Sequence, residues 1–597
     1  MEKVFPHLAG QSAETRTRRF FLALAVLLGF LQAWASRMDL VNDTVSYLDM
    51  GDGIWHGHWA MAINGLWGPL YAAILGIAVG VGRPSLYWEY PLVHLVVFAI
   101  FLFALWSFDF FLRQLISLRR ENESSEECAV PAWVWMTIGY TLFLWSCLQL
   151  IEVSETNPDM LVAAFFFCAC GMLVRIRRSA VGSATYLSFG LVLGLGYLTK
   201  SIMFPVSLLC LAAAFALGRR QPRQTWRFAG AVAVFLALAV PFIVALSLQK
   251  GRITFGESGH YNYAIHVDHV PRTHWQGETP GSGKPVHPSR QIVDRPATFE
   301  FGTPLEGTYP AWTDPSYWYD GVQTPFHLRS AIATETRLLR IETLFFFELH
   351  GALLATLFVM FYVGRVKLRD FSAYWFLLLP AAGALLMYAA IHIEPRYLAP
   401  FLVVFLLSLF VSVHLPSSLE SLRLSSGFAI FLFLMFIVPV ESTSLHVKEF
   451  LRDVTGRSKS DPNSYQAVAT AMQRLGLKPG DRIASLEYSL YGMSTWARLA
   501  RARIVAEVYY APGLAECASN DFWTSDPATQ EKVIQAVGKT GARVIVSHAA
   551  PAPPTAAGWS RVGNTDYYAY WLNPPTREFS GSSTPDPAAT RLVLKTK

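Results

Sequence analysis

The stretch MDLVNDTVSYLDMGDGIWHGHW, residues 38–59, places four aspartates directly after a long apolar run. That run, residues 20–37, follows three arginines and predicts a membrane span that begins in the cytoplasm. Its small-residue end, AWAS, also resembles a signal-peptide cleavage site, but the many apolar runs that follow favour an uncleaved anchor. The aspartates would then lie just outside the membrane, where ionisable groups are candidates for function.

The whole chain has the composition of a membrane protein. Of its 597 residues, 53% are hydrophobic and 15% are charged, whereas about 25% of the residues in a soluble domain are charged. The net charge of +6 comes from short basic clusters between apolar runs, so a nucleic-acid partner is not expected. The six cysteines show neither a metal-binding spacing nor a disulfide pattern.

The apolar runs predict a polytopic α-helical protein with about eleven transmembrane helices. With eleven spans, every strongly basic loop falls on one side, as expected for the cytoplasm. The opening stretch, a long loop and the C-terminal region then fall on the other side. The predicted spans are residues 20–37, 90–112, 132–150, 158–175, 184–199, 202–217, 227–248, 343–363, 372–392, 397–414 and 427–441.

The same pattern predicts three regions. Residues 1–441 form the membrane domain, whose first outer loop, 38–89, would carry interfacial helices. A second outer loop, 249–342, is too long to be a simple connector. Strand and helix signals alternate over residues 442–575, which predicts a soluble α/β domain, and residues 576–597 have a disordered composition.

The ionisable residues next to the span ends fall on the outer side of this topology. Lys200 and Arg396 do so against the usual bias of basic residues toward the cytoplasm. Each of these residues also has a purely structural explanation. A carboxylate in an outer loop could simply be solvated, Lys200 could extend to the membrane interface, and Arg396 could form a structural ion pair. Together they favour a site where an anionic lipid head group meets a second substrate. The acidic members are Asp39, Asp43, Asp49, Asp52, Glu89, Glu152, Glu155, Asp159 and Glu394.

Five motifs carry a resemblance to a known family. In order and topology they resemble the polytopic GT-C glycosyltransferases, which include the protein mannosyltransferases, the aminoarabinose transferases and the bacterial RgtA/B/C/D-like proteins. The resemblance covers about residues 20–415. It implies transfer of a sugar from a polyprenyl-phosphate donor to an acceptor hydroxyl at the outer membrane face, usually with inversion. The motifs are NDTVSYLDM (42–50), WGPLYAAIL (67–75), ETNPDMLVAA (155–164), GLGYLTKSIMFP (194–205) and EPRYLAPFLVVF (394–405).

The resemblance also implies roles for the carboxylates. Asp43 would be the base that takes the proton from the acceptor hydroxyl. Asp39, one helical turn earlier, stays an alternative, because Thr44 stands where the family often has a second acidic residue. Glu155 and Asp159 would orient hydroxyls of the acceptor or the sugar. Together with Asp43 they could also hold a divalent cation, although no spacing demands one.

Cations and aromatic rings complete the expected site. Lys200 and Arg396 would hold the lipid phosphate, since Arg can bind it bidentately, and Glu394 would orient Arg396. Substrate or interface contacts are expected from Tyr47, Trp275 and Tyr397, and sugar-stacking rings from Tyr309, Trp312, Tyr317, Trp318 and Tyr319.

The rest of the opening stretch is expected to have a structural role. Asp49 and Asp52 would lie on the solvated face of an interfacial helix, which His56 and Trp59 would anchor.

The resulting hypothesis is a multi-pass enzyme of the inner (plasma) membrane, with its site and C-terminal domain outside the cytoplasm. Its partners would be a polyprenyl-phosphate sugar, membrane lipid and a glycan, lipid or protein acceptor. A transporter of a lipid-linked sugar is the first alternative, but internal repeats and charges at mid-membrane are not evident. A non-catalytic scaffold is the second, and it leaves the outer positions of Lys200 and Arg396 unexplained.

Overall fold

A computed structural model describes most of the chain between residues 6 and 573. Some predictions therefore lie outside the described residues: the first part of the eighth span (343–350), the rings of Trp318 and Tyr319, and the tail 576–597. Within 6–573 the residues not described are 123–129, 179–180, 219–221, 271–272, 278–282, 287–288, 304, 318–319, 325–350, 352, 365–367, 416–417, 438–439, 458–460, 491, 510–520 and 549–557.

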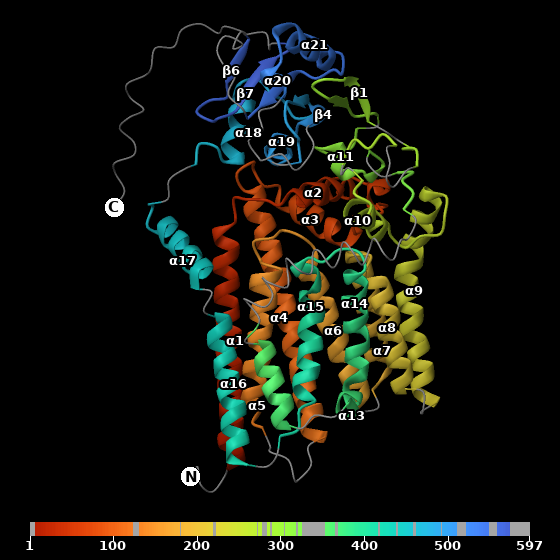
Figure 1. The fold of residues 1–597 in the computed structure, drawn as a ribbon, viewed down its shortest axis with the longest axis vertical. Coiled ribbons are helices and arrows are strands. Elements are labelled where there is room, and N and C mark those ends of the chain that lie inside the picture. The colour runs from red at the N-terminus through yellow and green to blue at the C-terminus, as the bar shows by residue number, and fades with distance from the viewer. Residues whose placement is uncertain are drawn as a thin grey trace.

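A bundle of long apolar helices makes up most of the molecule (Figure 1). Each of the eleven predicted spans contains helix among its described residues, and five helices in that part of the chain are long and apolar enough to cross a membrane. This confirms the polytopic helical class. The helices are α1 (Pro6–Ala35), α4 (Glu89–Asn122), α5 (Ala132–Trp145) with the π-helical turn η2 (Ser146–Leu150), α6 (Asp159–Arg178), α7 (Ser183–Thr199), α8 (Met203–Gly218), α9 (Pro222–Lys250), Leu353–Gly364, α14 (Trp375–Ala389), α15 (Pro395–Val411) and α16 (Leu419–Ile437).

Burial separates inner from outer helices of the bundle. In the most apolar stretch of α6, 89% of the residues are buried; in the corresponding stretch of α9 the share is 22%. α6 therefore lies inside the bundle, whereas α9 keeps an apolar surface exposed, as expected for a helix facing lipid tails. An ion pair between Arg18 and Asp109, 2.7 Å long, ties α1 to α4 near the end that carries the N-terminus.

Short helices lie across the other end of the bundle, which we call the sheet end (Figure 1). They are α2 (Asn42–Trp55), α3 (Pro69–Gly82) and α10 (Ser258–His266), accompanied by the 3-10 turn η1 (Trp59–Ala62). Residues 38–89, the predicted first outer loop, thus contain α2, η1 and α3. α2 and α3 cross closely because both have glycine at the crossing: a Cβ on Gly76 would come within 2.3 Å of the Gly51 carbonyl oxygen. The short helix α13 (Leu368–Phe371), with its turn η4 (Ser372–Tyr374), lies at the opposite end, where the N-terminus is.

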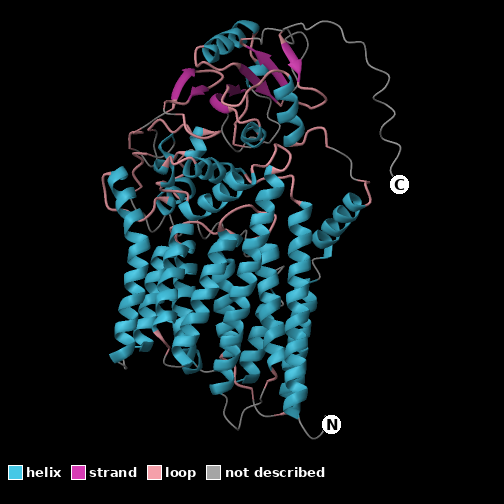
Figure 2. Cartoon of the chain, turned by 180° about the vertical axis from the view of Figure 1, so that it is seen from behind, coloured by secondary structure: helices cyan, strands magenta, loops and turns pink. Residues whose placement is uncertain are grey.

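A seven-stranded sheet lies beyond these cross helices (Figure 2). Its strand order is β1-β2-β4-β3-β5-β7-β6, with β3 parallel to both β4 and β5 and all other pairs antiparallel. The strands are β1 (Arg290–Val293), β2 (Thr298–Glu300), β3 (Arg482–Ser485), β4 (Arg503–Val508), β5 (Val544–Ser547), β6 (Trp559–Arg561) and β7 (Tyr568–Trp571).

Two of these strands come from the long loop 249–342 and not from the C-terminal region. β2 pairs with β4, so that Thr298 lies opposite Val508. The predicted boundary at residue 442 therefore leaves out part of the sheet, because strand pairing joins segments far apart in the sequence.

The remaining helices pack around the sheet or beside the bundle. α18 and α21 begin at the cap residues Ser464 and Asp526, whose side chains accept hydrogen bonds from backbone N–H groups of the first turn. α17 contacts α1. The elements are α11 (Pro310–Thr313), η3 (Pro315–Tyr317), α17 (Val440–Val454), α18 (Tyr465–Arg474), α19 (Met493–Leu499), α20 (Asp521–Thr524) and α21 (Pro527–Gly538).

Candidate functional site

A cavity of about 510 Å³ lies at the sheet end of the bundle. Its walls come from α2, the segment before α6, the α7–α8 junction, α10 and the start of α15. Apolar side chains, among them Ile202, Pro205, Met387 and Ile391, make up part of its lining. Six of the ten predicted site residues line it: Asp43, Tyr47, Asp159, Lys200, Arg396 and Tyr397.

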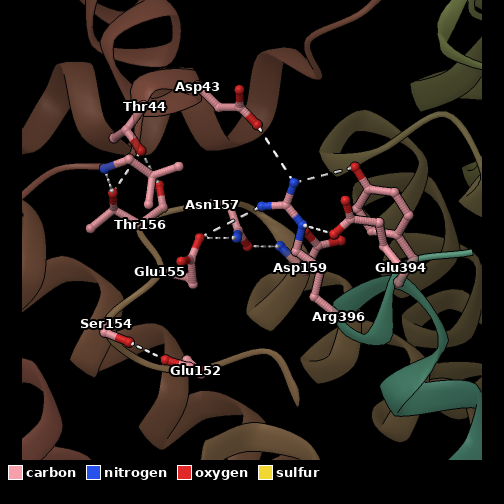
Figure 3. Close-up of polar contacts among 12 residues, drawn as sticks. Asp43, Thr44, Glu152, Ser154, Glu155, Thr156, Asn157, Asp159, Glu394 and Arg396 are labelled. Atoms are coloured by element: carbon pink, nitrogen blue, oxygen red, sulfur yellow. Dashed lines mark hydrogen bonds and ion pairs between the residues drawn. The ribbon is translucent and has the colours of Figure 1, made fainter. Parts of the chain in front are cut away.

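Arg396, in the first turn of α15, is surrounded by three carboxylates (Figure 3). Its nitrogens lie 3.8 Å from Asp43 Oδ2, 3.6 Å from Glu155 Oε2 and 3.4 Å from Glu394 Oε2. These distances exceed the roughly 2.7–2.9 Å of a direct charge-assisted hydrogen bond. Among the described residues, the buried Nε has no hydrogen-bond partner. The guanidinium therefore has donor capacity left for a ligand.

Lys200, the C-cap residue of α7, forms a second cationic group of the cavity. Its Nζ lies 2.6 Å from Asp159 Oδ1 and 3.6 Å from the ring centre of Tyr397. Burial lowers the pKa of the Lys200 amine, although the Asp159 carboxylate acts in the opposite direction. The two cations and the ring of Tyr397 thus form one wall of the cavity.

Asp159→Asn is expected to destabilise the protein strongly. The Lys200 ammonium would lose the carboxylate it contacts at a site where only 19% of its side chain is exposed. Breaking a buried ion pair by removing one partner costs roughly 3–5 kcal/mol. Thermal unfolding of the purified protein should show a clearly lowered midpoint. Asp566→Asn, which alters an exposed pair with Arg561, is the matched control; equal midpoints for the two variants would contradict the expectation.

Asp43 is held at the edge of the cavity by contacts from three segments. The indole N–H of Trp312 donates to Asp43 Oδ1 over 3.2 Å. The next residue, Thr44, donates its hydroxyl to the Thr156 carbonyl over 2.6 Å (Figure 3). Tyr71 donates to the same carbonyl over 2.8 Å. These bonds fix the start of α2 against the segment 155–159. Burial raises the pKa of Asp43, although Arg396 and the bond from Trp312 act against it.

Glu155 and Glu394 approach Arg396 without lining the cavity. The amide of Asn157 donates to Glu155 over 3.4 Å and its oxygen accepts from the Asp159 N–H over 3.1 Å. Burial raises the pKa of Glu155. A hydrogen bond from His392 lowers the pKa of Glu394, with Arg396 acting in the same direction. The two carboxylates thus differ in their tendency to stay charged.

Asp39 and Trp275 lie apart from the cluster around Arg396. Asp39 is exposed to solvent, and the charged group that acts on its pKa is Asp461, not a residue of the cluster. Trp275 is 1% exposed and packs in the core; it is not among the residues that line the cavity.

Glu152 has a left-handed backbone, with φ of 62°, and its carboxylate accepts a 2.7 Å hydrogen bond from the Ser154 hydroxyl.

The expectation that Asp49 lies on a solvated helix face is wrong. Only 6% of Asp49 is exposed, and it contacts Thr308 and Arg498. The long loop and the C-terminal domain cover that face of α2. Asp52 remains partly exposed, and Trp59 is 68% exposed.

Sequence reasoning missed the histidines of the cavity. His260 and His392 line it, and the ring of His392 stacks on His266 with a centroid distance of 3.6 Å. The position of His392 two residues before Glu394 was the one available signal. Trp312 was predicted as a sugar-stacking ring, and the structure shows it as a donor to Asp43.

The carboxylates of the site face the protein's own cations. Asp43 and Glu155 lie beside Arg396, and Asp159 contacts Lys200. In the part of the chain that the structure describes, no group of three or more His, Cys, Asp or Glu is arranged to hold a metal ion. The arrangement can bind an anion at the two cations while keeping a carboxylate of raised pKa beside it.

Comparisons with known proteins concern the fold. No protein-family model and no curated protein sequence matches the chain. Among solved structures, ArnT from Cupriavidus metallidurans bound to undecaprenyl phosphate is similar at a TM-score of 0.50 and 12% identity, over 93% of this chain and 98% of that one. The oligosaccharyltransferase AglB from Archaeoglobus fulgidus, in complex with an inhibitory peptide and a dolichol-phosphate, reaches a TM-score of 0.45 and 13% identity, over 89% and 69%. The chain therefore has the fold of the polytopic GT-C glycosyltransferases, as its sequence motifs predicted.

Proposed function

We propose that the protein is an inverting glycosyltransferase that moves a sugar from a polyprenyl-phosphate donor to an acceptor hydroxyl. The observation that carries the proposal is the cavity in which Lys200, Arg396 and Asp43 meet. The ArnT structure of the same fold was solved with undecaprenyl phosphate, and we extend that ligand class to this chain. The acceptor is a hydroxyl of a glycan, a lipid or a protein.

The two cations would bind the phosphate of the donor. When the bond between the sugar C1 and the phosphate oxygen breaks, the electron pair stays on that oxygen and the lipid phosphate gains negative charge. Fixed cations stabilise such charge, and Arg can do so bidentately. The three carboxylates lie 3.4–3.8 Å from the Arg396 nitrogens, farther than in direct hydrogen bonds, which suits a guanidinium that also binds a phosphate. The apolar part of the lining, with Met387 and Ile391, would take the first isoprenoid units.

Asp43 would act as the general base. It would accept the proton of the acceptor hydroxyl while the hydroxyl oxygen forms its bond to C1 from the side opposite the phosphate. Attack from that side inverts the configuration at C1. A carboxylate whose pKa is raised by burial is a better proton acceptor than a solvated one. Asp39, exposed and outside the cavity, is the weaker candidate for this role.

The sidedness of the membrane is part of the proposal. The helices α2 and α10, whose residues line the cavity, lie with the sheet at one end of the bundle, and the N-terminus and α13 lie at the other (Figure 1). The last turns of α4 and α6, with Arg119, Arg120, Arg177 and Arg178, lie at the N-terminal end, which the positive-inside bias assigns to the cytoplasm. We therefore place the cavity and the C-terminal domain on the outer side of the inner (plasma) membrane.

A panel of polyprenyl-phosphate sugars tests the proposal. The purified protein is incubated with each donor and with acceptor extracts, and free polyprenyl phosphate is measured. At least one donor should release lipid phosphate only when the protein is present. Binding without release from any donor, together with movement of the donor across vesicle membranes, would instead show a transporter.

The pH dependence should report the environment of Asp43. The base works only when ionised, and burial raises its pKa above the ordinary value of 3.8. Transfer should therefore rise with pH along an acidic limb that lies above that value. Trp312→Phe removes a hydrogen bond that lowers the pKa and should shift the limb further upward. Rate profiles of kcat/KM check this, with the exposed Trp226→Phe as control; a limb unmoved by Trp312→Phe contradicts it.

A further inference from the structure

A second group of charges joins the membrane bundle to the C-terminal domain. Arg498 of α19 lies 2.7 Å from Asp49, 2.7 Å from Asp52 and 2.9 Å from Glu89. Arg501 contacts Asp52 over 3.0 Å and Glu89 over 2.5 Å. Asp49 and Asp52 belong to α2 and Glu89 begins α4. We call these five residues the interdomain ion cluster.

The centre of the interdomain ion cluster is shielded from water. The exposed fractions of the side chains are 3% for Arg498, 4% for Asp49 and 2% for Glu89. Burial acts to lower the pKa of the Arg498 guanidinium, but the three carboxylates outweigh it and hold that pKa above its ordinary value. A buried arginine with three carboxylate partners is geometrically restrained, because its planar fork fixes where each carboxylate can lie.

The same α2 helix carries Asp43. Asp49 follows Asp43 by six residues, or about 9 Å along the helix axis. A movement of α2 at Asp49 therefore moves the carboxylate proposed as the base. Two further bonds keep the C-terminal domain on this end of the bundle: Tyr90 donates to the Thr495 carbonyl over 2.5 Å, and Gln466 donates to the Met38 carbonyl over 3.2 Å.

A second path of contacts runs through the long loop. The backbone N–H of Thr308 donates to Asp49 Oδ2 over 2.6 Å, and its hydroxyl donates to Oδ1 over 3.0 Å. Four residues later, Trp312 donates to Asp43. Gly307 makes the approach possible: its φ is +73°, and a Cβ there would lie 2.9 Å from Asp49 Oδ2. Asp49 thus ties both α2 and the loop to Arg498.

We propose that Arg498 is a positioning residue for the transferase site, which holds α2 and the segment 308–312 together so that the Asp43 carboxylate stays at the cavity. The inference rests on the proposed function for its catalytic readout, but its structural part does not. This role makes the C-terminal domain a component of the active enzyme, although none of the residues of that domain lines the cavity. The expected signature is a loss of rate without a loss of donor binding.

Arg498→Lys tests the role, since it keeps the charge but cannot reach three carboxylates with one planar fork. We expect kcat to fall about 10- to 100-fold, because small misplacements of catalytic groups have effects of that size. The Kd for polyprenyl phosphate should stay within about twofold of the wild-type value, as Lys200 and Arg396 are untouched. Hydrogen–deuterium exchange should become faster in residues 42–48 and 308–312. Arg543→Lys, which alters the Asp481 pair inside the same domain, is the matched control.

Asp52→Asn is the second variant, in case Arg498→Lys does not fold. It removes a partly exposed partner and leaves Arg498 with Asp49 and Glu89, so we expect the same changes at smaller size. Unchanged exchange in residues 42–48, with a kcat equal to that of Arg543→Lys, would overturn the proposal. If the wild type turns over no donor, the proposed function fails, and the exchange measurements still decide whether Arg498 fixes α2.

Discussion

Asp43→Asn is expected to abolish sugar transfer while the protein still folds and binds its donor. Asparagine has nearly the shape of aspartate and can still accept the bond from Trp312, but it cannot take a proton from the acceptor hydroxyl. Loss of a general base lowers kcat by roughly 10²- to 10⁴-fold. The Kd for the donor should not rise, because the change removes a negative charge beside Arg396 and so leaves that cation free to attract the donor phosphate.

Asp39→Asn is the matched control for that experiment. Asp39 lies four residues before Asp43 but is exposed and does not line the cavity, so we expect transfer close to the wild-type rate. Wild-type activity of Asp43→Asn together with an inactive Asp39→Asn would assign the proton to the other carboxylate. Both measurements use initial rates of polyprenyl-phosphate release.

Arg396→Gln is expected to have the second-largest effect. The change removes a cation proposed to stabilise the leaving phosphate, and loss of one such fixed group costs about 10²- to 10³-fold in kcat. Donor binding should weaken as well, because the ground-state phosphate is also charged. Three carboxylates would then lack the cation that they face, so the folded state of this variant must be checked by size-exclusion chromatography.

Arg396→Lys separates charge from geometry. Lysine keeps the positive charge, and therefore the folded site, but it lacks the planar fork. We expect a rate between those of the wild type and Arg396→Gln. The exposed Arg561→Gln serves as the control. A wild-type rate for Arg396→Gln would remove this residue from the phosphate site.

The membrane fold could be predicted because its signals are local. Apolar runs give the spans, and the basic loops give one consistent orientation. The same orientation put Asp43, Asp159, Lys200 and Arg396 on one side of the membrane. The structure brings these four residues to one cavity. Knowing that residues lie on the same side of the membrane is thus a strong restraint on which of them can be in contact, since it confines the possible partners to one surface.

Contacts between distant segments could not be predicted. Asp49 pairs with Arg498, 449 residues later in the chain, and no periodicity links the two. For the same reason β1 and β2 were not assigned to the sheet of the C-terminal domain, although β2 pairs with β4 and β1 pairs with β2. Asp49 was placed on a solvated face because a helix pattern shows which residues are polar, but not which partner covers them.

Isotope labelling of the donor shows which bond the enzyme breaks. A polyprenyl-phosphate sugar is made with oxygen-18 in the bridge between the sugar C1 and phosphorus, and the released lipid is analysed by mass spectrometry. Glycosyl transfer breaks the bond from C1 to oxygen, so we expect the heavy oxygen to leave with the polyprenyl phosphate. Heavy oxygen retained on the sugar would show cleavage at phosphorus and would contradict the proposed function, as would a donor that is bound but never cleaved.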